Sequence, residues 1–379
     1  MRMAELRFNR SFLVALLPMF LWIPSSGGAP VEPATLGIGA PAPDFNLPGV
    51  DGRNYRLSDF SDAKILVVAF TCNHCPTAQA YEQRIKALAQ DYRGKGVALV
   101  AISPNDPQAV RLDELGYTDL SDSFEEMKIR AQDQKFNFPY LYDGDEEKVS
   151  RAYGPTSTPH LFIFDSGRKL RYAGRVDDSE KGDKVKSSDA RNAIEALLAG
   201  RPVPVQKTKT FGCSIKWSEK RASVKSALQE WAGEPVSLQT IDEAGIRKLV
   251  RNDSKKLRLI NVWATWCGPC VIEFPELVAI NRMYRGREFE FVTISADAPE
   301  NKEQALGFLK KQQASSSNYI FSIDDKYKLV EAVDKEWPGA LPYTILVEPG
   351  GKVIFRVQGE LSPLELKKAI VARVGRYYP

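Results

Sequence analysis

Two Cys-x-x-Cys motifs, each placed between an apolar run and a helix-like run, constrain this 379-residue chain more than any other feature. Cys267 and Cys270 enclose Gly-Pro in NVWATWCGPCVIEFP, and Cys72 and Cys75 enclose Asn-His in TCNHCP. A cysteine at the start of a helix faces unpaired backbone N–H groups and the positive end of the helix dipole, which favour its thiolate. The two motifs therefore predict dithiol–disulfide chemistry at two places in one chain.

The length of the chain predicts two domains, because a single hydrophobic core seldom extends over 379 residues. Hydrophobic residues make up 43% and charged residues 26% of the sequence, which is typical of a globular protein. The formal net charge is only +4, so we expect no nucleic-acid partner.

The first 29 residues are typical of an export signal. Arg7 and Arg10 precede an apolar run at residues 12–23, and small residues follow at 25–29. The run is shorter than the roughly 20 residues of a membrane span, so we expect cleavage. Because Pro30 is an awkward residue after a cleavage site, an uncleaved N-terminal membrane anchor is the alternative. Export predicts an extracytoplasmic location, in the periplasm or at the outer face of the inner membrane, where disulfides persist.

Strand-like and helix-like segments alternate in both halves, which predicts α/β domains with a central sheet flanked by helices. In the first half we expect strands at 65–70, 97–102, 161–164 and 170–174, helices at 76–88, 124–136, 146–153 and 190–198, and an inserted polar loop at 105–123. In the second half we expect strands at 257–263, 290–295, 344–347 and 352–357, and helices at 241–250, 271–282, 302–311, 326–333 and 363–374. The predicted domains are residues 38–217 and 236–379, joined by a linker at 218–235.

The motifs resemble those of two branches of the thioredoxin superfamily. Residues 40–217 resemble AhpC/TSA-type redoxins through FTCNHCP, TPH and GCSIKW. The second half resembles the TlpA/ResA branch through WATWCGPC, the ExP-like segment at 273–275 and LPYTILV. The resemblance implies two tandem thioredoxin-like domains with thiol-disulfide oxidoreductase activity.

The resemblance also implies roles for the four motif cysteines. Cys267 and Cys72 should attack, and Cys270 and Cys75 should resolve the mixed disulfide. The implied redox-active disulfides are Cys72–Cys75 and Cys267–Cys270, with no other cofactor. The implied partners are protein dithiols or disulfides and a membrane or periplasmic thiol donor.

A proline loop is expected beside each dithiol. In such folds the Thr158–Pro159 peptide is cis and turns a backbone edge toward the sulfur, where a substrate strand can pair. Leu341 and Pro342 form the matching loop of the second half. The remaining residues assigned to the active-site loops are His74, His160 and Trp266.

Glu273 is the candidate proton carrier of the second site. It lies three residues, about one helical turn, past Cys270, where a partly buried carboxylate could exchange a proton with that thiol. The buried acid that ordinary thioredoxins carry on the preceding strand is replaced here by Asn261. The alternative is a solvated helix carboxylate with no role.

The dipeptides inside the two motifs predict different redox behaviour. A protonated His74 stabilises the Cys72 thiolate and so makes the first disulfide the better oxidant. Gly268-Pro269 supplies no charge. The hypothesis is that the second domain is the more reducing one and passes electrons to the first.

A metal site in the first domain is one alternative to redox chemistry. Cys72, Cys75, His74 and His160 make a conceivable zinc or copper set, but the two motifs lie about 195 residues apart, unlike the cysteine pairs of a zinc ribbon, so no metal is predicted. For either domain, the resemblance also leaves open a metal or cytochrome-maturation module that holds apocytochrome cysteines reduced.

A peroxiredoxin-like peroxidase is a further alternative for the first domain. Peroxiredoxins need a Pro-x-x-x-Thr-x-x-Cys frame, and Ile65 and Ala69 stand where that proline and threonine should precede Cys72. Peroxide reduction is therefore disfavoured.

Cys213, the one cysteine outside the two motifs, lies in a basic segment at 207–225 that we interpret as a solvated linker. It is either an inert buried thiol or a third redox thiol between the two domains.

Overall fold

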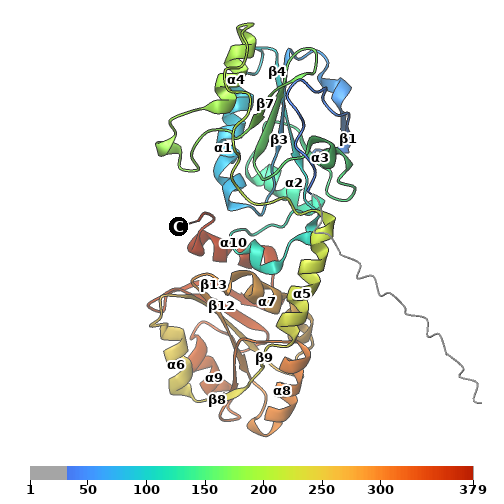
Figure 1. Ribbon diagram of the computed structural model, residues 1–379. Helices are drawn as coiled ribbons and strands as arrows, with labels where there is room; N and C mark the ends of the chain where they lie inside the picture. The colour runs from blue at the N-terminus through green and yellow to red at the C-terminus, as the bar shows by residue number, and fades with distance from the viewer. Residues whose placement is uncertain (1–31, 379) are drawn as a thin grey trace, which may run out of the picture. The chain divides into compact units, whose positions relative to one another are not determined.

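The computed structural model describes residues 32–378 (Figure 1). The predicted export signal lies outside the described residues. None of the described helices is both long enough and apolar enough to cross a membrane. The predicted domain boundaries remain predictions, and the names first domain and second domain refer to them below.

The first domain is built on a five-stranded mixed sheet with the order β5-β4-β3-β6-β7. The central strand β3 pairs in parallel with β4 and antiparallel with β6. The strands are β1 (Asn46–Pro48), β2 (Asn54–Arg56), β3 (Ile65–Phe70), β4 (Val97–Ser103), β5 (Tyr140–Tyr142), β6 (His160–Phe164) and β7 (Leu170–Gly174). The helices are α1 (Pro76–Asp91), α2 (Phe124–Asp133), α3 (Lys148–Tyr153) and α4 (Asp189–Leu198).

Strand β3 is buried on both faces, as its unbroken apolar run predicts. Val67 and Ala69 belong to the core formed with α1, α2 and α4. Leu66 and Val68 belong to the opposite core, formed with α3 and the β1–β2 hairpin. Figure 1 shows α1 and α4 on one side of this sheet and α3 on the other.

The second domain is built on a six-stranded mixed sheet with the order β13-β12-β9-β10-β11-β8. The strands are β8 (Gln239–Ile241), β9 (Leu257–Trp263), β10 (Phe289–Ser295), β11 (Ser317–Phe321), β12 (Tyr343–Val347) and β13 (Val353–Gln358). The helices are α6 (Glu243–Arg251), α7 (Gly268–Tyr284), α8 (Lys302–Lys311), α9 (Lys326–Val333) and α10 (Pro363–Val374). The α/β class predicted for both halves is confirmed.

Alternation along β9 again divides the core between two layers. Leu257 and Leu259 pack with α7 and α10, whereas Ile260 and Val262 pack with α6 and α9. The last residue of the strand, Trp263, packs with α7 and α8.

The segment between the domains differs from the predicted linker. Residues 221–232 form helix α5 (Arg221–Ala232) within the segment predicted as a linker. Before it, Ile215 and Trp217 are only 1% and 3% exposed, and Lys216 pairs with Glu114. Residues 215–217 are thus buried, whereas Lys207, Lys209 and Lys225 are exposed, as a solvated segment predicts.

The inserted segment at residues 105–123 belongs to the first domain and contacts the second. It is largely irregular, as predicted, with two 3₁₀ turns, η2 (Pro107–Ala109) and η3 (Leu112–Leu115). Its Val110 and Leu115 belong to the apolar cluster that contains Leu277 of α7. At the last residue of α7, the Tyr284 hydroxyl donates a hydrogen bond of 2.6 Å to the carbonyl of Thr118. The insertion thus packs against the second domain at the C-terminal end of α7.

Candidate active sites

In the first motif it is the second cysteine that caps the helix. Strand β3 ends at Phe70, α1 begins at Pro76, and Cys75 is its N-cap residue. The Cys75 Sγ accepts hydrogen bonds from the backbone N–H groups of Ala78 at 3.4 Å and Cys213 at 3.3 Å. Burial opposes ionisation, but the thiols of Cys213 and Cys72, the charge of His74 and the helix N–H hold the pKa of Cys75 well below its usual range.

The other thiol, Cys72, faces the loop before the proline. Its Sγ lies 3.1 Å from the Thr158 Oγ1, and the residue is 2% exposed. Burial and the neighbouring Cys75 and Asp122 raise the pKa of Cys72 well above its usual range. The attacking role that the resemblance implies for Cys72 stays a prediction, while the helix itself begins only after Cys75, with Pro76 at its first position.

A buried ion pair between His74 and Asp122 forms part of this site. The His74 Nδ1 lies 2.5 Å from the Asp122 Oδ2, and both side chains are at most 2% exposed. Burial lowers the pKa of His74, but the carboxylate of Asp122 more than offsets this and raises it. Burial likewise opposes the Asp122 charge, yet His74 and its other donors keep the pKa of Asp122 below its usual value. The carboxylate of Asp122 thus favours the protonated form of His74, and the charge of that form lowers the pKa of Cys75.

Asp122 is a site residue that the sequence reasoning missed. It also accepts hydrogen bonds from the backbone N–H groups of Asn73 at 2.8 Å and His74 at 3.0 Å, and from Asn105 Nδ2 at 2.7 Å. Its only sequence signal is an acidic residue in a polar insertion just before a helix. Nothing in that position indicates a partner 48 residues upstream.

The Thr158–Pro159 peptide is cis, which confirms the expectation from the resemblance. The adjacent backbone edge is already occupied. The Thr158 N–H donates to the carbonyl of Cys213 at 3.0 Å, and the two residues form an antiparallel bridge. The edge at which a substrate strand was expected therefore holds a segment of this same chain.

His160 is not part of a cluster with the cysteines. Its Nδ1 accepts the N–H of Thr156 at 3.2 Å, and its ring stacks on Phe162 with centroids 4.5 Å apart. Burial lowers the pKa of His160 to about 4, so the ring is neutral near pH 7. Among the described residues, the potential ligand atoms that lie within 4.8 Å of one another belong to Cys72, His74 and Asp122, which is not the set proposed from the sequence.

In the second motif the first cysteine caps the helix, as expected. Helix α7 begins at Gly268, and the Sγ of its N-cap residue Cys267 accepts the N–H of Cys270 at 3.3 Å. Cys267 and Cys270 form a disulfide. Trp266, Gly268 and Pro269 are exposed around it, whereas every residue at 71–79 of the first motif is buried.

Glu273 of α7, three residues past Cys270, is held by Asn261. The Asn261 Nδ2 donates to Glu273 Oε1 at 3.2 Å and to Thr344 Oγ1 at 3.0 Å, which ties β9 to α7 and β12. Burial raises the pKa of Glu273 to about 7, although hydrogen bonds from Asn261 and the Leu361 backbone oppose the shift. A carboxyl group with that pKa can hold or release a proton at neutral pH, unlike a fully solvated one.

An open cavity lies beside the second proline loop, where the Leu341–Pro342 peptide is also cis. Its volume is about 280 Å³, and Trp266, Trp337, Leu341 and Lys326 contribute to its lining. Leu341 also packs against the cluster that contains both cysteines. Trp263, by contrast, is fully buried, in agreement with the expectation of a core residue.

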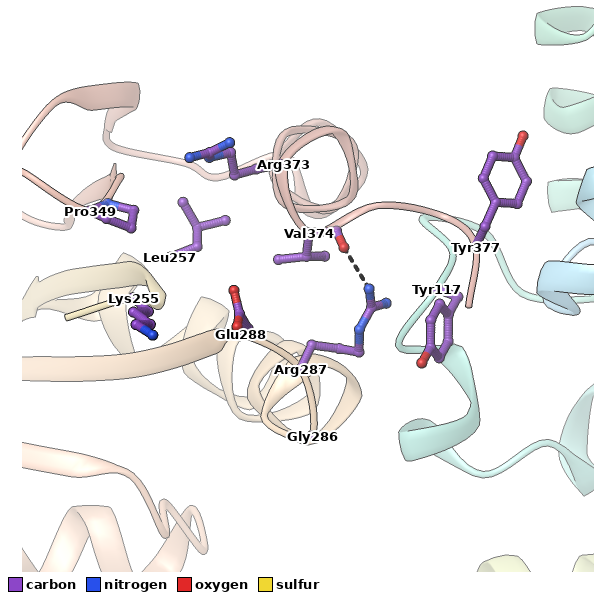
Figure 2. A pocket seen from close by; sticks show the side chains of 10 residues that line it. All are labelled: Tyr117, Lys255, Leu257, Gly286, Arg287, Glu288, Pro349, Arg373, Val374 and Tyr377. Carbon is purple, nitrogen blue, oxygen red and sulfur yellow. Dashed lines mark hydrogen bonds between the residues drawn. The ribbon is translucent and has the colours of Figure 1, made fainter. Parts of the chain in front are cut away.

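A larger cavity of about 750 Å³ lies away from both dithiols (Figure 2). Its lining contains no cysteine and includes Leu257, the first residue of β9, at the opposite end of that strand from the second motif. Arg287 is held there by the Val374 carbonyl (Figure 2).

The two dithiols are far apart in the structure. Asn73 of the first motif donates to the Ser121 carbonyl, three residues from the Thr118 carbonyl that meets the C-terminal end of α7. Cys267 lies at the other end of this 17-residue helix, which spans about 25 Å. Direct exchange between the two sulfur pairs is not favoured by this arrangement.

Two family models match the chain. Residues 38–173 match the AhpC/TSA family and residues 232–370 match Redoxin. Each match covers one of the two sheets and its dithiol motif.

Individual relatives are similar over part of the chain. The thiol:disulfide interchange protein HelX of Rhodobacter capsulatus is 28% identical over 116 residues, which is 30% of this chain and 59% of HelX. The thiol-disulfide oxidoreductase ResA of Bacillus subtilis is 29% identical over 103 residues, 27% of this chain and 53% of ResA. The chain thus spans little more than half the length of these curated relatives. A crystal structure of an uncharacterized conserved protein from Geobacillus kaustophilus is 39% identical and covers 50% of this chain and 96% of its own, with a TM-score of 0.44.

Proposed function

The chain is a two-domain member of the thioredoxin superfamily, and from this premise we propose that it is a thiol-disulfide oxidoreductase acting on protein dithiols and disulfides. One observation carries the proposal: in each domain a cysteine caps the helix that follows the central strand. A cis-proline loop accompanies each of these cysteines. The helix N–H groups stabilise a sulfur anion, which is both the attacking and the leaving group of thiol–disulfide exchange.

At the second site the reduced form would act as an electron donor. The Cys267 thiolate attacks a partner disulfide and releases one partner sulfur, giving a mixed disulfide. Cys270 then loses its proton to Glu273 and attacks Cys267, so the Cys267–Cys270 disulfide forms and the second partner sulfur leaves. Two electrons pass to the partner, whose disulfide becomes two thiols. Run backwards, the same steps oxidise a partner dithiol.

The surface around the second site favours a protein substrate. Trp266 is 59% exposed beside the dithiol, and the cavity next to Leu341 is open. An exposed tryptophan at the edge of an apolar cavity is typical of a contact that carries much of a binding energy. We therefore propose that an extended segment with an apolar side chain near its cysteine binds here.

At the first site, the helix terminus and the protonated form of His74 favour a thiolate on Cys75, and so the reduced form. We propose that this site is the more oxidising of the two. Redox titration of full-length chains that keep one pair each, C267S/C270S and C72S/C75S, tests this. A lower potential for the first pair would contradict the proposal.

We propose an extracytoplasmic location, supported by Arg7, Arg10 and the apolar run after them. The redox-active disulfides would be the only redox groups. Fractionation of cells that express the full chain, with and without its first 29 residues, tests the location.

A trapping experiment tests the activity itself. Cys270→Ser in the full-length chain should accumulate mixed disulfides between Cys267 and its clients, because the resolving thiol is missing. Cys267→Ser is the matched control and should trap far less. If Cys270→Ser traps nothing and the parent chain fails to reduce a protein disulfide, the proposal is wrong. Hydrogen peroxide consumption with a thiol donor, in place of exchange, would favour the peroxidase alternative.

A further inference from the structure

The first dithiol is enclosed. Cys72 and Cys75 are 2% and 0% exposed, and all of residues 71–79 are buried. A protein partner must bring its own sulfur atom into line with the sulfur it attacks. The exchange proposed above for the first domain therefore needs a way for the disulfide to reach the surface.

Cys213 lies between the enclosed dithiol and the surface. Its side chain packs against the cluster of Cys72, Cys75 and Ala78, while the flanking Gly212 and Ser214 are exposed. Its N–H donates to the Cys75 Sγ at 3.3 Å, and its carbonyl accepts the N–H of Thr158 at 3.0 Å. A segment bridged to this loop in antiparallel fashion, with a cysteine beside the reactive sulfur, resembles the geometry expected of a bound substrate. Here the chain supplies that substrate itself.

The position of Cys213 is enforced by its neighbours. Gly212 has φ +139°, and a Cβ there would collide with the Thr158 carbonyl, so the close approach requires glycine. On one side Phe211 packs against Tyr81, with ring centroids 6.0 Å apart. On the other side the Lys216 N–H donates to Asn105 Oδ1 at 2.9 Å. The cysteine is thus held against Cys75 from both directions.

We propose that Cys213 is a third redox thiol, which takes over the disulfide from the buried Cys72–Cys75 pair as a Cys75–Cys213 disulfide and presents it to protein partners.

The transfer is balanced and leaves the oxidation state of the chain unchanged. The Cys213 thiol loses its proton, and its sulfur attacks the Cys75 Sγ. The Cys75–Cys213 bond forms as the Cys72–Cys75 bond breaks, and Cys72 leaves as a thiolate that takes up one proton. A partner thiolate then attacks the Cys213 Sγ and Cys75 leaves. The partner's second thiol resolves the mixed disulfide, so that two electrons enter the chain.

The electrostatics favour two parts of this sequence, the ionisation of Cys213 in the oxidised state and the later departure of Cys75. While Cys75 is a thiolate, the hydrogen bond that Cys213 makes to it, together with burial, raises the pKa of Cys213 and keeps it protonated. In the Cys72–Cys75 disulfide that negative charge is gone, and Cys213 can ionise more easily. When the partner thiolate attacks the Cys75–Cys213 disulfide, Cys75 is the better leaving group of the two, because a sulfur with a low pKa leaves faster.

A partner can approach from one side of the segment. A surface groove of about 530 Å³ is lined by Phe211, Gly212 and Ser214, together with Lys207 and Lys209. The two lysines favour a partner with acidic residues near its cysteine.

The decisive experiment maps disulfides in the full-length chain with the second pair removed by C267S/C270S. In this background Cys72→Ser is oxidised with diamide, free thiols are alkylated with N-ethylmaleimide after an acid quench, and peptides are analysed by mass spectrometry. We expect a Cys75–Cys213 disulfide in most molecules. If Cys213 is recovered alkylated while Cys75 forms sulfenic acid or an intermolecular disulfide, the proposal is overturned.

A second variant tests the route to the surface. In the same background, Cys213→Ser keeps the Cys72–Cys75 pair, and we expect its reduction by reduced thioredoxin to slow by roughly tenfold or more, because the accessible sulfur is gone. Reduction by a small phosphine should change little. Equal rates with thioredoxin for variant and parent would refute the relay. If this variant fails to fold, as judged by its circular dichroism, the mapping of Cys72→Ser decides alone.

The inference rests on the proposed exchange function, but the two can fail separately. A chain that forms the Cys75–Cys213 disulfide but exchanges with no protein keeps the inference and contradicts the function. Exchange at the first domain without this disulfide does the opposite.

Discussion

The two dithiol sites occupy the same place in their sheets, yet a different cysteine caps the helix in each. Both motifs connect a buried central strand, β3 or β9, to the helix that follows it. Helix α7 begins directly after Cys267, but α1 begins three residues later in its motif, after Cys75. The position of the helix start, rather than the order of the cysteines, decides which sulfur is stabilised as a thiolate.

The sites also differ in what accompanies the sulfur. The first has a fixed charge pair, His74 and Asp122, and the second has a carboxyl group, Glu273, whose pKa of about 7 lets it exchange a proton. The loop before the first proline is paired with Cys213, whereas the second loop borders an open cavity. One site keeps its polar groups buried inside the protein, and the other borders a cavity that opens at the surface.

The largest expected effect comes from neutralising the buried pair of the first site. Asp122→Asn should lower the free energy of unfolding by about 3 kcal/mol, because it disrupts a fully buried, hydrogen-bonded charge. Denaturant unfolding measures this. Asp113→Asn, in the exposed pair with Arg111, should cost less than about 1 kcal/mol. Equal losses in the two variants would mean that the buried pair has no special role.

Next in size is the proton exchange of the second site. Glu273→Gln should slow the resolving step about 100-fold, because the proton acceptor is lost. The rate of that step should also lose its pH dependence near pH 7, where Glu273 titrates. Single-turnover kinetics from pH 5 to 9 measure this. Glu276→Gln on the same helix is the control, and the first site should not respond. An unchanged pH profile would exclude Glu273 as the proton carrier.

The same carboxyl group links stability to pH. The folded-state pKa of Glu273 is raised from its ordinary 4.5 to about 7, so its relative stabilisation of the fold is present below about pH 4.5 and is lost as the pH rises through 7. Glu273→Gln should remove this slope from the unfolding free energy of the full-length chain. A slope that persists unchanged in the variant would contradict the assigned shift.

A smaller effect is expected at the exposed surface of the second site. Trp266→Ala should weaken binding of a protein disulfide by about 1–2 kcal/mol, or roughly tenfold in KM, and leave a small disulfide such as oxidised glutathione nearly unaffected. Leu228→Ala, at an exposed position of α5, is the control. If Trp266→Ala affects both substrates equally, the tryptophan acts on the sulfur chemistry and not on recognition.

The smallest effect concerns access to the first site. The Tyr378 hydroxyl lies 4.0 Å from the Cys213 Sγ, and the adjacent Arg376 is held by Asp119 at 2.7 Å. Arg376→Ala should loosen residues 376–378. The N-ethylmaleimide labelling rate of Cys213 should then rise severalfold, which corresponds to a free energy of local opening lowered by on the order of 1 kcal/mol. Arg373→Ala, which removes a more exposed pair with Glu348, should not. Unchanged labelling would show that the tail does not limit access.

Local patterns in the sequence predicted much of the fold and part of each site. The apolar runs became the central strands β3 and β9, and the resemblance correctly implied a cis Thr158–Pro159 peptide. The strands and the cis peptide depend on residues that are close together in the sequence. Asp122 and Cys213 reach the first motif from 48 and 138 residues away, and no local pattern encodes such contacts. Helix α1 was expected to begin near Pro76, but the order of the cysteines does not show that this start makes Cys75, and not Cys72, the N-cap residue.

The insertion at residues 105–123 couples the unfolding of the two domains. One end of it supplies Asp122 to the His74 pair, and the other buries Val110 and Leu115 against α7. Loss of structure in either half would therefore expose apolar surface and an unpaired charge in the other. We expect the two sheets to melt together as one cooperative transition, so that neither half would behave in isolation as it does in the whole chain.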